Sequence, residues 1–222
     1  MAQEIGRILR PSVAQFQGKR ILLLVPLVHG PGDDLPDGKA ILDRYWTQAT
    51  SQVFALELQL GLVRHVYHEG LVAGGLPALG ELEEMGYPSV GLVRRKVESG
   101  AFLEATEDAE RLVETLDLQR CLMLPLASEK VAQRLVEWFT QSLQQRYQHV
   151  ARAVDATLKP GEVGLMLIGE RHQVQFPPDV EVLYVAPPAL DEFRRWVTEW
   201  VAQQQAEAAA AEAAEEGQTP QA

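Results

Sequence analysis

VGLMLIG, residues 163–169, is an almost unbroken apolar run that ends at a glycine. A strand with one face in water alternates apolar and polar side chains, whereas a continuous apolar run indicates a strand covered on both faces. Three more segments have this character: ILLLVPLV (21–28), CLMLPL (121–126) and VEVLYVAP (180–187). Strands of this kind occur in parallel or mixed sheets flanked by helices, so these runs indicate an α/β fold.

Two further segments, LVRHVYHE (62–69) and SVGLVRRKV (89–97), bring the predicted strands to about six. Helical patterns lie between the strands, over residues 38–59, 76–85, 104–116 and 128–158. The last of these is the longest, and Ser128 is its expected N-cap. A C-terminal helix is expected to start near Pro188. The sequence therefore predicts a central, mostly parallel or mixed sheet of about six strands flanked by helices, and it leaves the strand order open.

The alternation of helix and strand continues without a linker, so residues 1–201 are predicted to form a single α/β domain. Beyond Val201 the apolar stripe of the C-terminal helix stops. Residues 202–222 are rich in Ala and Glu, which are good helix formers, but they have no apolar face to bury. We therefore expect this tail to fray and then to be disordered.

The charge of the chain bears on its partners. The formal net charge is −11, and binding to nucleic acid needs clustered Lys and Arg, so nucleic acid is not the expected partner. A local basic cluster, Arg94, Arg95 and Lys96, is interpreted as the solvated end of a strand. Contact with RNA or a ribosome through this cluster is the weaker alternative.

Cysteine usage and apolar run lengths bear on the compartment. Cys121 is the single cysteine and lies in an apolar run, so it is predicted to be buried, and the lack of a disulfide fits a reducing compartment. The N-terminus has no apolar stretch of signal-peptide length, and the run at 21–28 is too short to span a bilayer. These features predict a soluble cytoplasmic protein without a membrane partner.

VRHVYHEG, residues 63–70, contains two histidines and a glutamate. On a helix, His65, His68 and Glu69 would share one face and could bind a metal. The segment is short, lies between two glycines and is rich in Val, His and Tyr, which favours a strand. On a strand, His65 and Glu69 face one way and His68 the other. We therefore expect neither a metal site nor a cofactor here, and we expect His65 to pair with Glu69.

Polar residues follow two of the predicted strands. VHGPGDD (28–34) places His29, Asp33 and Asp34 beyond the first strand, where ligands bind in open α/β sheets. Asp33 and Asp34 are candidate ligand-binding residues, because a carboxylate pair can hold a divalent cation. His172, which follows the strand at 163–169 together with Glu170, is a third candidate ligand-binding residue.

Three residues are candidates for acid–base chemistry. Glu98 falls at the end of the strand predicted over 89–97. If the strands before His29 and Glu170 are parallel neighbours, then His29, Glu98 and Glu170 could converge. A separation of more than ~12 Å, beyond hydrogen-bond reach even through a water, would exclude a shared catalytic site.

The motifs for nucleophilic catalysis, Gly-x-Ser-x-Gly and CxxC, do not occur in the sequence. The favoured interpretation is a non-catalytic binding or protein-interaction module. It would bind a protein partner or a small-molecule ligand and self-associate through helical faces rich in Trp and Leu. The alternative is a hydrolase-type enzyme that uses His29 as a base with nearby carboxylates and, in one version, a divalent cation. The sequence leaves open whether the chain is an enzyme.

Overall fold

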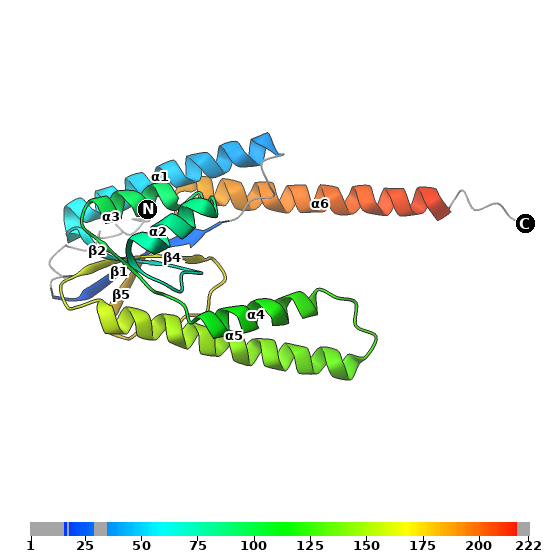
Figure 1. The fold of residues 1–222 in the computed structure, drawn as a ribbon. Coiled ribbons are helices and arrows are strands. Elements are labelled where there is room, and N and C mark those ends of the chain that lie inside the picture. The colour runs from blue at the N-terminus through cyan, green and yellow to red at the C-terminus, as the bar shows by residue number, and fades with distance from the viewer. Residues whose placement is uncertain (1–15, 17, 29–34, 217–222) are drawn as a thin grey trace, which may run out of the picture. The chain divides into compact units, whose positions relative to one another are not determined.

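The computed structural model describes residues 16, 18–28 and 35–216. Within them the chain forms five strands and six helices, and the predicted α/β fold is confirmed (Figure 1). The strands are β1 (Arg20–Leu27), β2 (Val63–His68), β3 (Phe102–Glu104), β4 (Val163–Gly169) and β5 (Val180–Tyr184). The helices are α1 (Pro36–Leu60), α2 (Gly75–Glu84), α3 (Val90–Glu98), α4 (Ala109–Leu122), α5 (Glu129–Thr157) and α6 (Pro188–Glu216). The long helix predicted over 128–158 is α5, and the predicted C-terminal helix is α6.

The five strands form one parallel sheet in the order β3-β2-β4-β1-β5. Every residue of β1 is buried, as its apolar run predicts. Gly164 of β4 lets the neighbouring side chains pack closely, because a Cβ there would lie 3.0 Å from Leu22 Cδ1 and 3.2 Å from Tyr67 Cε2. Since the strands are parallel, their carboxyl ends meet at one edge of the sheet, which we call the C-terminal edge.

Helices cover both faces of the sheet. Val150 and Val154 of α5, with Leu158 just after it, pack against one face. Their neighbours in this core cluster are Leu22, Leu24, Tyr67, Met166, Ile168 and Val180. Helix α3 contacts β2 and helix α2 contacts β3, and Figure 1 shows both on the face opposite α5. This double cover explains why the central strands are apolar along their whole length.

The sequence predicts a strand over 89–97, but this segment forms α3. The buried residues Leu92 and Val93 lie four and three positions before the buried Lys96, which is the spacing of one helix face. Lys96 hides this spacing in the sequence because a lysine normally marks an exposed face. Here its ammonium group is buried against the carboxylate of Glu57. The basic cluster is therefore not a solvated strand end.

The predicted strand over 121–126 is also wrong. These residues form the end of α4 and the turn toward α5, and Cys121, predicted to be buried, is exposed. The apolar side chains of this segment lie on the surface, so the run does not mark a buried strand. The strand that the pattern missed is β3, because three residues are too few to show a period.

The chain divides into two compact units. One lies within Met1–Leu27 and Val53–Val185 and contains the sheet, and the other lies within Val28–Gln52 and Ala186–Ala222. The second unit contains the first part of α1 together with α6, so α1 is divided between the units.

Polar contacts join α1 and α6 within the second unit. Arg44 Nη2 lies 2.5 Å from Glu192 Oε1, and the Ala189 N–H donates to Gln48 Oε1 at 3.1 Å. Helix α6 continues through the Ala/Glu-rich tail to Glu216, and its residues 201–210 are exposed. Among the helices that the structure describes, none is long and apolar enough to cross a membrane.

Candidate functional site

A buried ion-pair cluster lies at the C-terminal edge of the sheet. Arg146 of α5 places its guanidinium between Glu69, which follows β2, and Glu107, which precedes α4. Arg146 Nη2 lies 2.9 Å from Glu69 Oε1 and 2.5 Å from Glu107 Oε1, and Arg146 Nε donates to Glu107 Oε2 at 2.9 Å. The side chain of Glu107 is fully buried, and that of Arg146 is 9% exposed. Such a two-pronged contact is the strong form of a guanidinium–carboxylate pair.

The two carboxylates of this cluster also bind backbone. The Gly169 N–H donates to Glu69 Oε2 at 2.6 Å, and the Gly70 N–H donates to Glu107 Oε1 at 3.3 Å. Burial alone would lower the pKa of Arg146, but its contacts with Glu107 and Glu69 raise that pKa overall, so the guanidinium stays charged. The cluster therefore fixes the ends of β2 and β4 against α5.

The histidines of β2 lie on opposite faces of the strand, as predicted. His65 Nδ1 lies 2.7 Å from Glu104 Oε1, and His65 Nε2 lies 3.2 Å from Glu162 Oε2. The expected pairing of His65 with Glu69 is therefore wrong, because the neighbouring strand and the residue before β4 supply nearer carboxylates. In the part of the chain that the structure describes, no three His, Cys, Asp or Glu side chains are grouped to hold a metal ion.

His68 is fully buried and contacts neutral groups. Its Nε2 lies 2.9 Å from Ser89 Oγ, and its Nδ1 lies 2.7 Å from the Glu69 backbone oxygen. These contacts satisfy a buried imidazole within the core, so His68 has a structural role.

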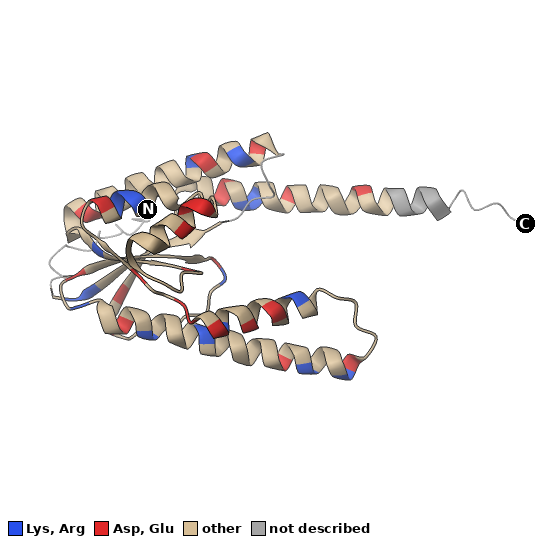
Figure 2. Ribbon diagram, viewed as in Figure 1, with Lys and Arg blue, Asp and Glu red and all other residues tan. Residues whose placement is uncertain are grey.

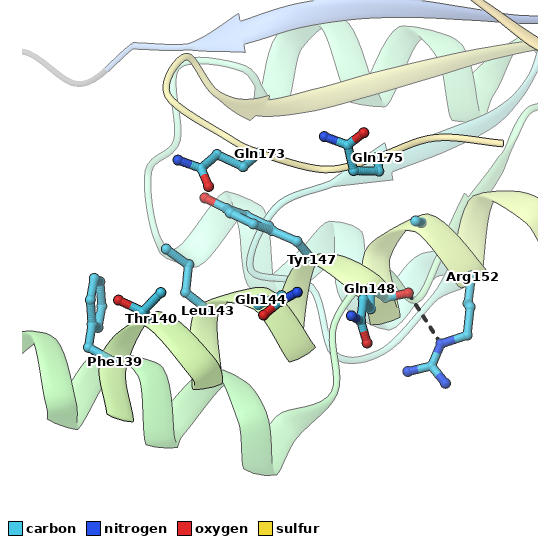
Figure 3. A pocket seen from close by; sticks show the side chains of 10 residues that line it. Phe139, Thr140, Leu143, Gln144, Tyr147, Gln148, Arg152, Gln173 and Gln175 are labelled. Atoms are coloured by element: carbon cyan, nitrogen blue, oxygen red, sulfur yellow. Dashed lines mark hydrogen bonds between the residues drawn. The ribbon is translucent and has the colours of Figure 1, made fainter. Parts of the chain in front are cut away.

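A groove of about 750 Å³ lies beside the ion-pair cluster, between α5 and the β4–β5 connection (Figure 3). Its lining is mostly neutral. The lining residues are Phe139, Thr140, Leu143, Gln144, Tyr147, Gln148, Ala151, Arg152, Gln173 and Gln175. Figure 3 shows the Tyr147 ring between the helix and the connection, with its hydroxyl toward Gln173. Burial raises the pKa of the Tyr147 phenol and the charge of Glu69 raises it further, so the hydroxyl stays protonated and can donate.

The wall of the groove opposite α5 is residues 172–176, a segment outside the helices and strands that we call the strap. Its side chains alternate as in a strand: Val174 and Phe176 pack into the core, and Gln173 and Gln175 line the groove. The strap is anchored at its start, where the His172 N–H donates to the Gly169 oxygen at 3.1 Å.

The strap is not part of the sheet, and its backbone is incompletely paired. The Val174 N–H donates to His172 Nδ1 at 3.2 Å. By contrast, within the described residues the backbone N–H and C=O groups of Gln173 and Gln175 have no hydrogen-bond partner. These four groups remain available to an extended backbone placed beside the strap.

The structure places three of the six sequence-predicted site residues. Glu98 is the last residue of α3 and precedes β3, so it lies toward the sheet edge opposite to the C-terminal edge. Glu170 follows β4 at the C-terminal edge, and the Tyr184 hydroxyl donates to its Oε1 at 3.4 Å. The structure therefore does not bring Glu98 to Glu170. His172 begins the strap, and burial lowers its pKa against the opposing charge of Glu69, which favours the neutral imidazole.

The remaining three residues, His29, Asp33 and Asp34, lie outside the described residues. The condition attached to His29 is met, because β1 and β4 are parallel neighbours with Leu27 opposite Gly169. Sequence reasoning missed the groove residues. The alternation of glutamine with apolar residues in HQVQF, 172–176, is the signal that could have identified the strap.

Comparisons with known proteins add no relative to this description: no protein-family model, no curated protein and no solved structure matches the chain.

Proposed function

We propose that this chain is a non-catalytic, cytoplasmic binding module whose groove takes an extended peptide segment of a protein partner. The observation that carries the proposal is the set of unpaired backbone groups at Gln173 and Gln175. Addition of a strand to an exposed backbone edge is a common mode of peptide recognition, in which main-chain hydrogen bonds provide affinity. The strap offers such an edge, and α5 offers the surface beside it.

The groove also fits the side chains of such a peptide. Phe139, Leu143 and Tyr147 lie four positions apart and form one stripe along α5. Alternate side chains of an extended peptide would rest on this stripe, while the others would face solvent. The volume of about 750 Å³ is in the range typical of binding pockets.

Charge favours an acidic group near one end of the peptide. Arg152 is the one charged residue in the lining, and there is no carboxylate among the lining residues. Its Nε donates to the Gln148 backbone oxygen at 3.2 Å, whereas within the described chain its two Nη groups have no partner. A peptide carboxylate would pair with this guanidinium.

The same geometry favours binding over the alternatives. Among the described residues at the sheet, Glu69, Glu107 and His65 are engaged in contacts inside the protein. Two of the three residues of the basic cluster considered for RNA are also engaged, because Lys96 is buried and Arg94 Nη2 lies 2.8 Å from Glu83 Oε1.

Selection from a display library of random peptides, with the full chain as bait, tests the proposal. We expect peptides with alternating apolar residues to be enriched. Leu143→Arg should abolish their binding in calorimetry, whereas Leu76→Arg, at an exposed leucine on α2, should leave it unchanged. Equal affinity of the selected peptides for wild type and Leu143→Arg, or no enrichment of any peptide, would refute the proposal.

Amide hydrogen exchange tests the pairing itself. Bound peptide is expected to slow exchange at Gln173 and Gln175, because their N–H groups gain partners. Binding without any change at these two amides would show that the peptide does not pair with the strap.

A further inference from the structure

Residues 109–138, which we call the arm, comprise α4, the turn after it and α5 up to Trp138. The two helices of the arm extend beyond the edge of the sheet as an antiparallel pair (Figure 1). The arm exposes many large apolar side chains. They are Val113, Leu116, Met123, Leu124, Leu126, Val131, Val136 and Trp138. Exposed apolar side chains that gather on one surface mark interaction sites in soluble proteins. On α5, Val131 and Trp138 are seven positions apart and therefore share one helix face.

The contact between the two helices leaves these side chains exposed. Near the base of the arm the helices meet through polar groups: Thr115 Oγ1 lies 3.0 Å from Ser142 Oγ, and Ser142 Oγ donates to Glu114 Oε2 at 3.1 Å. Arg111 also donates to the side-chain oxygen of Gln145. Leu118, Leu122 and Leu135 of the arm are half-buried, whereas the eight side chains named above are exposed, so the pairing of α4 with α5 leaves those eight uncovered.

The charge of the arm indicates what covers it. The formal net charge of the whole chain is −11, but residues 109–138 contain five acidic and four basic side chains and are almost neutral. Figure 2 shows both signs mixed along α4 and α5. Two ion pairs within the arm, Arg120–Asp117 and Arg134–Glu137, each have an N–O distance of 2.8 Å. Copies of an acidic protein repel one another, and that repulsion is smallest where the surface is neutral.

We propose that the arm is the surface through which two copies of this chain associate. Two helical pairs of this kind can pack across a twofold axis as four helices, and a twofold contact places the same apolar residues on both sides. The neutral surface suits a second copy, whereas a strongly basic partner would be drawn to the acidic remainder of the molecule. None of the eight exposed side chains of the arm lines the peptide groove.

Sedimentation velocity of the purified full chain tests the proposal. We expect a concentration-dependent dimer that persists in high salt, because the contact is apolar. Met123→Glu and Trp138→Glu should each yield a monomer. Leu76→Glu is the matched control, since Leu76 is 72% exposed and Met123 is 73% exposed, and it should remain dimeric. A monomer at all concentrations, or a dimer unaffected by both arm variants, would refute the proposal.

Cys121 provides a second readout, because it is the single cysteine and lies exposed near the tip of α4. A nitroxide label on this thiol should give a defined dipolar coupling between the two copies, since both labels would lie near the contact. A dimer without measurable coupling would place the contact elsewhere on the molecule. Loss of peptide binding in Leu143→Arg with retention of the dimer would separate this proposal from the function of the groove.

Discussion

At the scale of single residues, Arg146 shows how a buried charge constrains the fold. Removal of a guanidinium from water is costly, and the cost is offset only if every charged neighbour is paired. Glu107 has no exposed side-chain surface, and its main cationic partner is Arg146. Loss of the arginine therefore leaves an unpaired carboxylate in the interior.

Arg146→Met is expected to lower the free energy of unfolding by roughly 3–5 kcal/mol, as measured by urea denaturation. The control Arg152→Met, at an exposed arginine of the same helix, should change it by less than about 0.5 kcal/mol. Addition of Glu107→Leu to Arg146→Met should recover part of the loss. If the double variant is no more stable than the single one, the unpaired carboxylate is not the cause.

His172 makes stability depend on pH. Its pKa is lowered in the folded protein by burial, so the unfolded chain binds more protons once the pH falls below about 6.5. Protonation then favours unfolding, and stability decreases as the pH is lowered. We expect His172→Gln to lose less free energy of unfolding than wild type between about pH 7 and pH 5. If the free energy of unfolding of the two proteins changes equally with pH, His172 is not the source of the pH dependence.

At the scale of elements, the sequence identifies those with a long, regular pattern. β1, β4 and α5 are predicted close to their observed bounds because burial on both faces, or along one stripe, repeats over many residues. The prediction for α3 is wrong because Lys96 places a charge on the buried face of this helix. The partner of that charge, Glu57, lies 39 positions away in the sequence. No local pattern can reveal such a partner.

In the strap, the alternation of buried side chains with side chains that line the groove can be tested directly. Val174→Ala should lower the free energy of unfolding by roughly 1–3 kcal/mol, because Val174 is buried in the core. Gln175→Ala should change it by less than about 0.5 kcal/mol, because that side chain faces the groove. Urea denaturation of both variants measures the difference, and equal losses would show that the strap does not alternate as described.

At the scale of the whole molecule, the sequence indicates the sheet edge where ligands bind in parallel α/β proteins, but not the site itself. Glu170 and His172 are found at that edge, whereas Glu98 is not, because its predicted strand is a helix. The groove depends on α5 lying beside a segment that follows β4, which is a tertiary relation. The identity of a single residue such as Gln173 does not indicate which helix will lie beside it.

Removal of residues 205–222 changes the charge of the molecule without removing described core residues. The segment contains four glutamates and no basic residue, so the net charge goes from −11 to −7. With weaker repulsion between copies, we expect tighter self-association at low salt and no difference at high salt. Sedimentation at two ionic strengths measures this effect. An unchanged association constant at low salt would show that net charge does not oppose the contact.

The strand order has a consequence for how the protein is made. β1 lies between β4 and β5, so Arg20 pairs with Val180 and Ile21 with Val163. During translation, this apolar strand is made before both of its neighbours: it has none until β4 is complete at Gly169, and it has both only when the nascent chain has grown past Tyr184. We expect chaperones that hold exposed apolar segments to engage residues 20–27 throughout that interval.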